Sequence, residues 1–175
     1  MKISIKFIAQ AAMIAAIYVA LTIAGGALSF IPIQFRISEA LCILPIFTPA
    51  AIPGLVIGCF IANFGSPYGL IDILGGSFAT LLAVIVTRQL RNITFKGIPY
   101  LAPLPAVIFN ALIVGAYLVI AVEGGSPVFS AFTFAAFIPI AISVGIGQLV
   151  VCYGLGLPLA MALKKSGVNK VFNLK

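Results

Sequence analysis

The chain has 175 residues, of which 63% are hydrophobic and only 7% are charged, and its mean hydropathy is +1.28. About a quarter of the residues of a soluble domain are charged, so this composition excludes a water-soluble protein and indicates an integral membrane protein. The net charge of +7 then fits the basic cytoplasmic loops of a multi-pass protein of the cell membrane better than a nucleic-acid-binding surface. The length suits one membrane domain over residues 1–175.

The residue types on which most enzyme and metal sites depend are missing or scattered. The sequence has no histidine, which is the commonest general base and a common metal ligand, and it has no Gly-Lys nucleotide-binding motif. Cys42, Cys59 and Cys152 lie in apolar runs without a Cys-x-x-Cys spacing, so we expect small buried thiols. The sequence therefore predicts no enzyme activity, no metal site and no cofactor.

An apolar run over residues 7–28 predicts the first membrane helix. The alternative is a cleaved signal peptide that starts with Lys2 and Lys6, but the run is long enough to span a membrane and no soluble domain follows it. Ala12, Ala16 and Ala20 recur at every fourth position and share one helix face, which permits close approach of another helix. This face either packs inside the bundle or contacts a partner protein.

Residues 38–64 are long for one membrane crossing and short for two, and the basic residues decide between these readings. Two crossings place nine of the ten basic residues on one side and leave Arg36 alone on the other, as the positive-inside rule prefers. We therefore predict half-length helices over 38–47 and 51–64, with Ser38 as the cap of the first. Their broken ends must be covered by protein or line a cavity, since lipid cannot satisfy backbone groups.

Further apolar runs predict helices over 70–90, 102–122 and 131–163, which completes an all-α membrane protein with six transmembrane helices. Both termini are then predicted to be cytoplasmic. The last run exceeds one span, so we expect a kink near Gly145/Gly147 or Gly154/Gly156, a cytoplasmic overhang, or both.

The carboxylates Glu39, Asp72 and Glu123 are all predicted on the outer side of this bundle, and Arg36 is expected to pair with Glu39 three residues away. Ionisable residues at membrane depth are candidates for function, and carboxylates with aromatic rings suit a flat, nitrogen-rich ligand. Helix starts, interhelical hydrogen bonds and an interfacial aromatic belt are the structural alternatives. The candidate substrate-binding residues are Arg36, Glu39, Asn63, Asp72, Asn110, Tyr117, Gln148, Phe35 and Tyr68.

A family resemblance rests on two stretches, IQFRISEALCILPIFTPAAIPGLVIGCFIANF and GLIDILGGSFATLLA. They resemble the QueT family of queuosine-precursor transporters, which look like substrate-binding S-components of energy-coupling factor (ECF) transporters. The resemblance implies an S-component-like six-helix bundle with an outer pocket for a queuosine precursor or queuine, which are 7-deazaguanine compounds. It also implies that Ala12, Ala16 and Ala20 contact the transmembrane coupling subunit and that two cytoplasmic ATPase subunits supply the energy. The matching positions are Arg36, Ser38, Glu39, Asn63 and Asp72.

The expected function is thus that of a membrane-embedded substrate-binding subunit of an ATP-dependent importer. Three alternatives stay open: an S-component for another vitamin-like compound, an autonomous channel or secondary carrier, and a membrane enzyme that uses Glu39 and Asp72 as acid and base. Titration with a panel of ligands separates the first alternative from the expected function. Uptake by the isolated chain in liposomes would favour the second.

Overall fold

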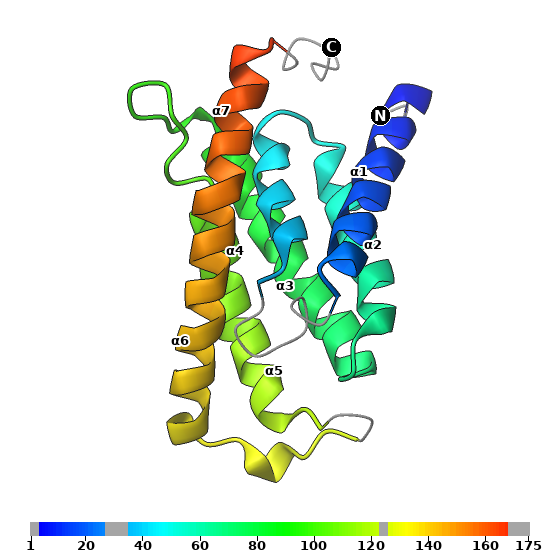
Figure 1. The fold of residues 1–175 in the computed structure, drawn as a ribbon, viewed down its shortest axis with the longest axis vertical. Helices are drawn as coiled ribbons and strands as arrows, with labels where there is room; N and C mark the ends of the chain where they lie inside the picture. Colours follow the sequence, from blue (N-terminus) through cyan, green and yellow to red (C-terminus); the bar gives the residue numbers. More distant parts are fainter. Residues whose placement is uncertain (1–3, 27–34, 123–125, 168–175) are drawn as a thin grey trace.

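The computed structural model describes residues 4–26, 35–122 and 126–167, and these residues form an all-helical bundle (Figure 1). Within them, six helical segments follow one another along the chain. Three are long and apolar enough to cross a membrane, namely Ile5–Ala24, Leu70–Asn92 and Phe134–Lys165, and three are shorter, namely Ile37–Ile46, Ala51–Gly65 and Leu104–Ile120. This arrangement confirms the prediction of an all-α membrane protein.

The helices begin and end close to the predicted ranges. The first half contains α1 (Ile5–Ala24), the 3-10 helix η2 (Ile37–Ile46), α2 (Ala51–Ala62), η3 (Asn63–Gly65), α3 (Leu70–Gln89) and η4 (Leu90–Asn92). The second half contains α4 (Leu104–Phe109), the π turn η5 (Asn110–Val114), α5 (Gly115–Ile120), η6 (Phe129–Ala131), α6 (Phe134–Val151), the π turn η7 (Cys152–Gly156) and α7 (Leu157–Lys165). The chain stays helical through each π turn, so α4 to α5 and α6 to α7 are two long helices.

The segment η2 differs from the predicted half-length α-helix. It is a 3-10 helix that includes Pro45, whose missing N–H cannot support a regular helix. The predicted cap at Ser38 is wrong, because Arg36 occupies the capping position and Ser38 lies inside the helix. The Ser38 hydroxyl instead lies 2.7 Å from the hydroxyl of Thr22 on α1. Figure 1 shows η2 rising from the middle of the molecule toward the end at which α1 starts.

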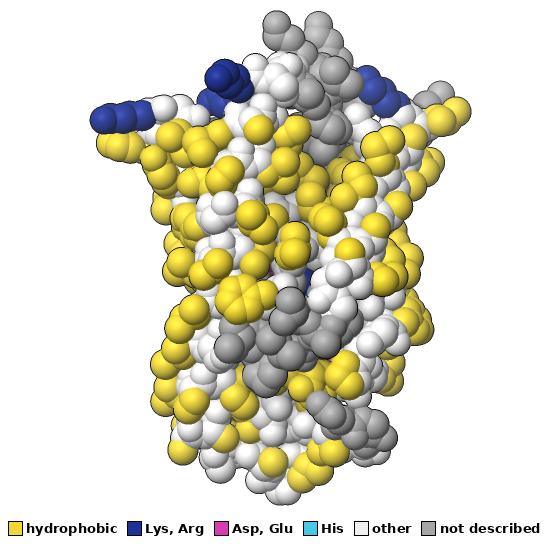
Figure 2. Space-filling view, viewed as in Figure 1, with side chains coloured by type: hydrophobic (Ala, Val, Ile, Leu, Met, Phe, Trp, Pro, Cys, Tyr) yellow, Lys and Arg dark blue, Asp and Glu magenta, His cyan; other side chains and the backbone are white. Residues whose placement is uncertain are grey.

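Basic side chains gather at one end of the bundle. Figure 2 shows Lys and Arg over the start of α1, the loop after α3 and the end of α7, while hydrophobic side chains cover the length of the molecule below them. The start of α1 and the end of α7 therefore lie at the same end of the bundle (Figure 1). An even number of helical segments between them accounts for this placement.

The helices α1 and α2 pack closely because α2 presents glycines to α1. A Cβ atom at Gly54 would lie 2.7 Å from the carbonyl oxygen of Ala11, and one at Gly58 would lie 2.9 Å from the Cβ of Tyr18. The buried face of α1 is therefore the one that carries Ala11, Ala15 and Tyr18. The predicted small-residue face formed by Ala12, Ala16 and Ala20 is exposed instead, so it does not pack inside this bundle.

Replacing Gly58 with alanine is expected to destabilise the protein by about 1–3 kcal/mol, since the added methyl group overpacks a helix contact. Its neighbours are the Cβ of Tyr18 and the backbone of Ala15, which cannot move aside without separating α1 from α2. Unfolding of the purified protein in detergent measures the effect. Gly154→Ala is the matched control, because a Cβ there meets nothing within 4 Å. Equal stability of the two variants would contradict the expectation.

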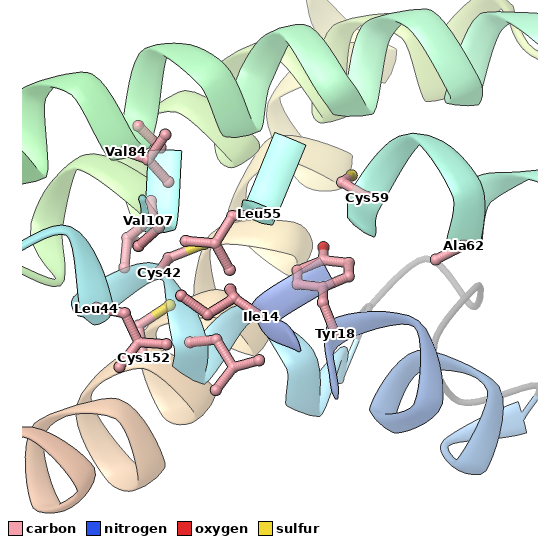
Figure 3. Packing of buried hydrophobic residues seen from close by; sticks show 14 residues of the cluster. Ile14, Tyr18, Cys42, Leu44, Leu55, Cys59, Ala62, Val84, Val107 and Cys152 are labelled. Carbon is pink, nitrogen blue, oxygen red and sulfur yellow. The ribbon is translucent and has the colours of Figure 1, made fainter. Parts of the chain in front are cut away.

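The main apolar core lies between α1, η2, α2, α3, α4 and η7 (Figure 3). Leu55 is completely buried at its centre, and Val84 and Val107 approach it from α3 and α4. In Figure 3, Tyr18 and Cys59 lie at one end of this core, away from Leu44 and Cys152. Polar side chains begin at that end, and they form the candidate site.

Candidate functional site

Nine polar side chains are buried between the helices, and we call them the polar cluster. Each of them is at most 7% exposed. They are Tyr18, Arg36, Glu39, Asn63, Asp72, Thr80, Asn110, Tyr117 and Gln148. They come from α1, η2 and the residue before it, η3, α3, and both long C-terminal helices. Burying polar groups costs free energy unless they find partners, so their contacts decide what the cluster can do.

Glu39 lies on η2 and is held at both carboxylate oxygens. The hydroxyl of Tyr18 donates a hydrogen bond to Oε1, and the thiol of Cys42 donates to Oε2 at 3.1 Å. The amide nitrogen of Asn110 donates to Oε2 as well, at 3.4 Å. Helix α1 and the π turn η5 are thereby connected through one carboxylate. This placement brings together two of the predicted residues, Glu39 and Asn110.

Asp72 lies on the first turn of α3 and binds two other members of the cluster. Its Oδ1 accepts a hydrogen bond from the hydroxyl of Tyr117. Its Oδ2 lies 3.9 Å from the guanidinium Nη2 of Arg36. The amide nitrogen of Asn63 donates to the backbone oxygen of Asp72 at 2.8 Å. Four of the predicted residues, Arg36, Asn63, Asp72 and Tyr117, therefore meet around one carboxylate.

The expected ion pair between Arg36 and Glu39 has to be corrected. The carboxylate within ion-pair distance of Arg36 is that of Asp72, while Glu39 contributes an electrostatic interaction. The reason is the backbone of Arg36, whose φ of −83° and ψ of 94° are extended rather than helical. The spacing of three residues places two side chains on one side only within a helix. Arg36 precedes η2, so its side chain is free to reach α3.

The cysteines are free and buried, as predicted, but they contact polar groups and not only apolar ones. The Cys59 sulfur lies 3.6 Å from the amide nitrogen of Asn63 and 3.9 Å from Nη1 of Arg36. The Cys152 thiol approaches the side-chain oxygen of Gln148 at 3.5 Å. Cys152 also approaches the backbone oxygen of Glu39 at 3.7 Å, so it links the predicted Gln148 to Glu39. The described residues hold no group of three or more side chains suited to a metal ion.

Two cavities lie between α3, α5 and the chain after residue 125, at the end away from the basic residues. One, of about 670 Å³, is lined by the half-buried Tyr68 together with Leu74 and Phe129. The other, of about 550 Å³, is lined by Tyr117 and shares Gly75 and Phe129 with the first. Tyr117 therefore connects the second cavity with the polar cluster, because its hydroxyl binds Asp72.

The structure does not bring Phe35 together with the other predicted aromatic residues. Phe35 lines a separate cavity of about 340 Å³, whose other walls include Gly25, Val151 and Leu155. Glu123, which the sequence also predicts on the outer side, lies outside the described residues. The predicted site thus divides into a buried polar cluster, a cavity wall with Tyr68 and Tyr117, and Phe35 in a separate cavity.

Sequence reasoning missed two members of the cluster, Tyr18 and Thr80. Tyr18 lies within an apolar run and resembled any other aromatic residue of a membrane helix. The available signal was helical spacing, since Tyr18 follows Ala11 and Ala15 on one face of α1. Thr80 follows Asp72 by eight residues and Gly76 by four, so it shares the buried face of α3. A threonine on the same helix face as Asp72 was the signal that could have indicated Thr80 as a member of the cluster.

Comparison with known proteins gives a consistent set of findings. A family model described as QueT transporter matches residues 8–165 of the chain. The queuosine precursor transporter QueT of Lactococcus lactis subsp. cremoris (strain MG1363) is 42% identical over 73 residues. This match covers 41% of the chain and 43% of that relative, which is less than half of either protein. No solved structure matches the chain.

Proposed function

Because this chain belongs to the QueT transporter family, whose members are transporters and not enzymes, we propose that it binds a queuosine precursor or queuine inside the membrane. It acts as the substrate-binding S-component of an ECF importer, with the ligand held at the polar cluster. The relative from Lactococcus lactis carries a name that specifies a queuosine precursor, which supports this substrate class. The ECF arrangement follows from the family resemblance of the sequence.

The observation that carries the proposal is the burial of Arg36, Glu39 and Asp72 within an apolar bundle. A 7-deazaguanine has adjacent N–H donors on one edge and a carbonyl oxygen beside them. Carboxylates accept such N–H groups, while a guanidinium or an amide donates to a carbonyl. The cluster holds both kinds of group within a low-dielectric interior, where hydrogen bonds discriminate strongly between ligands. Tyr117 and Tyr68 offer rings on which a flat ligand stacks.

The proposed orientation of the chain in the membrane follows from the distribution of charge. Basic side chains gather at the end of the bundle where α1 starts and α7 ends (Figure 2). The positive-inside rule assigns this end to the cytoplasm, so both termini are cytoplasmic. The cavities beside Tyr68 and Tyr117 then lie near the outer side, where an importer has to capture its ligand.

The energy for import comes from partner proteins. The sequence has no Gly-Lys nucleotide-binding motif of its own, which suits a chain that relies on two cytoplasmic ATPase subunits. The exposed Ala12, Ala16 and Ala20 face of α1 is the surface that contacts the transmembrane coupling subunit. Small residues allow two helices to approach closely in a membrane.

Calorimetric titration of the purified full chain in detergent tests the proposed function. We expect binding of queuine or of its earlier 7-deazaguanine precursors, which carry a cyano or an aminomethyl group at position 7, and no binding of riboflavin or thiamine. The Glu39→Gln and Asp72→Asn variants should each bind at least about tenfold more weakly, as the loss of a hydrogen bond to a charged group predicts. Failure of every 7-deazaguanine to bind the wild type would refute the proposal.

A further inference from the structure

The two carboxylates of the polar cluster differ in what they still offer a ligand. Both oxygens of Glu39 already accept hydrogen bonds, Oε1 from Tyr18 and Oε2 from Cys42 and Asn110. Asp72 uses Oδ1 for Tyr117, while within the described part of the chain its Oδ2 accepts no hydrogen bond and has the Arg36 guanidinium at the longer distance of 3.9 Å. A buried oxygen that accepts no hydrogen bond destabilises the folded state by about 1–3 kcal/mol, so its presence needs an explanation.

Two further side-chain oxygens are buried and accept no hydrogen bond from the described residues. They are Oδ1 of Asn63 and Oγ1 of Thr80. Neither residue is more than 1% exposed. Asn63 is fixed beside Asp72, because its amide nitrogen donates to the Asp72 backbone at 2.8 Å. Gly76 permits this approach, since a Cβ there would lie 2.7 Å from the Asn63 amide nitrogen. Thr80 lies one turn beyond Gly76 and next to Cys59.

We infer that Asp72, and not Glu39, is the carboxylate that recognises the ligand, with Asn63 and Thr80 as additional acceptors. This inference rests on the function proposed above. The guanine-like edge of a 7-deazaguanine presents two adjacent donors, the ring N–H and the exocyclic amino group. They match two buried acceptors without a hydrogen bond, Oδ2 of Asp72 and Oδ1 of Asn63, on residues that are joined by the bond from the Asn63 amide nitrogen to the Asp72 backbone oxygen.

Thr80 accepts from the five-membered ring of the ligand. The eight residues from Asp72 to Thr80 correspond to about 12 Å along a helix. A bicyclic heterocycle with one hydrogen bond at each end has a similar length. The pyrrole N–H of a 7-deazaguanine lies on the five-membered ring, across N3 from the amino group, and donates to Thr80. Glu39 is then a positioning residue, which holds Tyr18 and Asn110 in place.

Comparing 7-deazaguanine with 7-deazahypoxanthine, which lacks the amino group, tests the role of Asp72. We expect the wild-type chain to bind 7-deazaguanine about 10–100 times more tightly, since an unpaired acceptor penalises the analogue. Asp72→Asn should reduce this preference to within about threefold, because a neutral amide accepts more weakly. Glu39→Gln should weaken both compounds by the same factor and keep the preference, since it acts through positioning.

Thr80→Val provides a test that does not depend on a buried charge. Valine removes a hydroxyl whose contact in the described structure is with the Cys59 thiol, a weak hydrogen-bonding group, so folding is retained and the unfolding midpoint changes little. Affinity for 7-deazaguanine should fall about 3–10-fold with the loss of one neutral hydrogen bond. Thr87→Val is the matched control on α3, because Thr87 donates to the Ala102 carbonyl at 3.0 Å, at the basic end. It should lower the unfolding midpoint and leave affinity unchanged.

The outcomes separate this inference from the proposed function. If Glu39→Gln loses the preference for the amino group while Asp72→Asn keeps it, the assignment of the two carboxylates is overturned. If Thr80→Val binds 7-deazaguanine as tightly as the wild type, Thr80 has no part in recognition. If the wild type binds neither compound nor any queuosine precursor, the proposed function itself fails.

Discussion

Replacing Arg36 with methionine is expected to destabilise the protein by about 3–5 kcal/mol, the largest effect of any single substitution considered. The physical reason is that Asp72 and Glu39 are both buried, and Arg36 supplies the positive charge that interacts with them. Removing one partner of a buried ion pair leaves an uncompensated charge in a low-dielectric interior. Denaturant or thermal unfolding of the purified chain in detergent measures the loss.

A double variant makes the cause of this loss testable. Arg36→Met combined with Asp72→Asn removes both charges of the pair, so most of the lost stability should return while ligand binding stays absent. Arg91→Met is the control, because Arg91 is exposed at the basic end and should change stability by less than about 0.5 kcal/mol. An Arg36→Met protein as stable as this control would show that the ion pair is not needed for folding.

Replacing Ala16 with tryptophan is expected to reduce ATP-dependent uptake by more than tenfold, which corresponds to about 1.4 kcal/mol or more of lost association. Ala16 is exposed at the middle of the small-residue face of α1, where we propose that the coupling subunit docks. A large ring prevents the close helix approach that small residues permit. Uptake in cells that express the whole transporter, together with co-purification of the coupling subunit, measures the effect.

Ligand binding by the isolated Ala16→Trp chain should stay unchanged, because the side chain at position 16 points away from the polar cluster. Ile146→Trp on α6 is the matched control, since Ile146 is 56% exposed on a different helix. It should leave both uptake and co-purification intact. Equal uptake by the two variants would exclude the Ala12, Ala16 and Ala20 face as the docking surface.

The arrangement of helices was accessible from the sequence because a membrane limits what a chain can do. Helical segments satisfy their own backbone hydrogen bonds in lipid, so apolar length locates them. The harder choice, between one and two segments over residues 38–64, was resolved by the isolated position of Arg36 among the basic residues. The structure has two short helices there, η2 and α2.

The partners of the buried polar side chains could not be predicted from the sequence in the same way. Arg36 pairs with Asp72, and Glu39 with Tyr18, and the members of each pair come from different helices. The spacing of three residues predicted that Arg36 pairs with Glu39, but this rule holds only if both residues are helical. Arg36 has an extended backbone instead, at the position before η2. Interhelical geometry therefore decided the contacts within the site.

In the two π turns, the number of residues matters as well as their identity. Each begins at a residue that contacts Glu39, Asn110 in η5 and Cys152 in η7. A π turn holds one residue more than the α-helix around it, and losing that residue turns the remaining helix by about 100°. Tyr117, which follows η5, would then leave Asp72. Single-codon deletions in these turns should therefore be purged by selection even though the encoded segment would remain a good apolar helix.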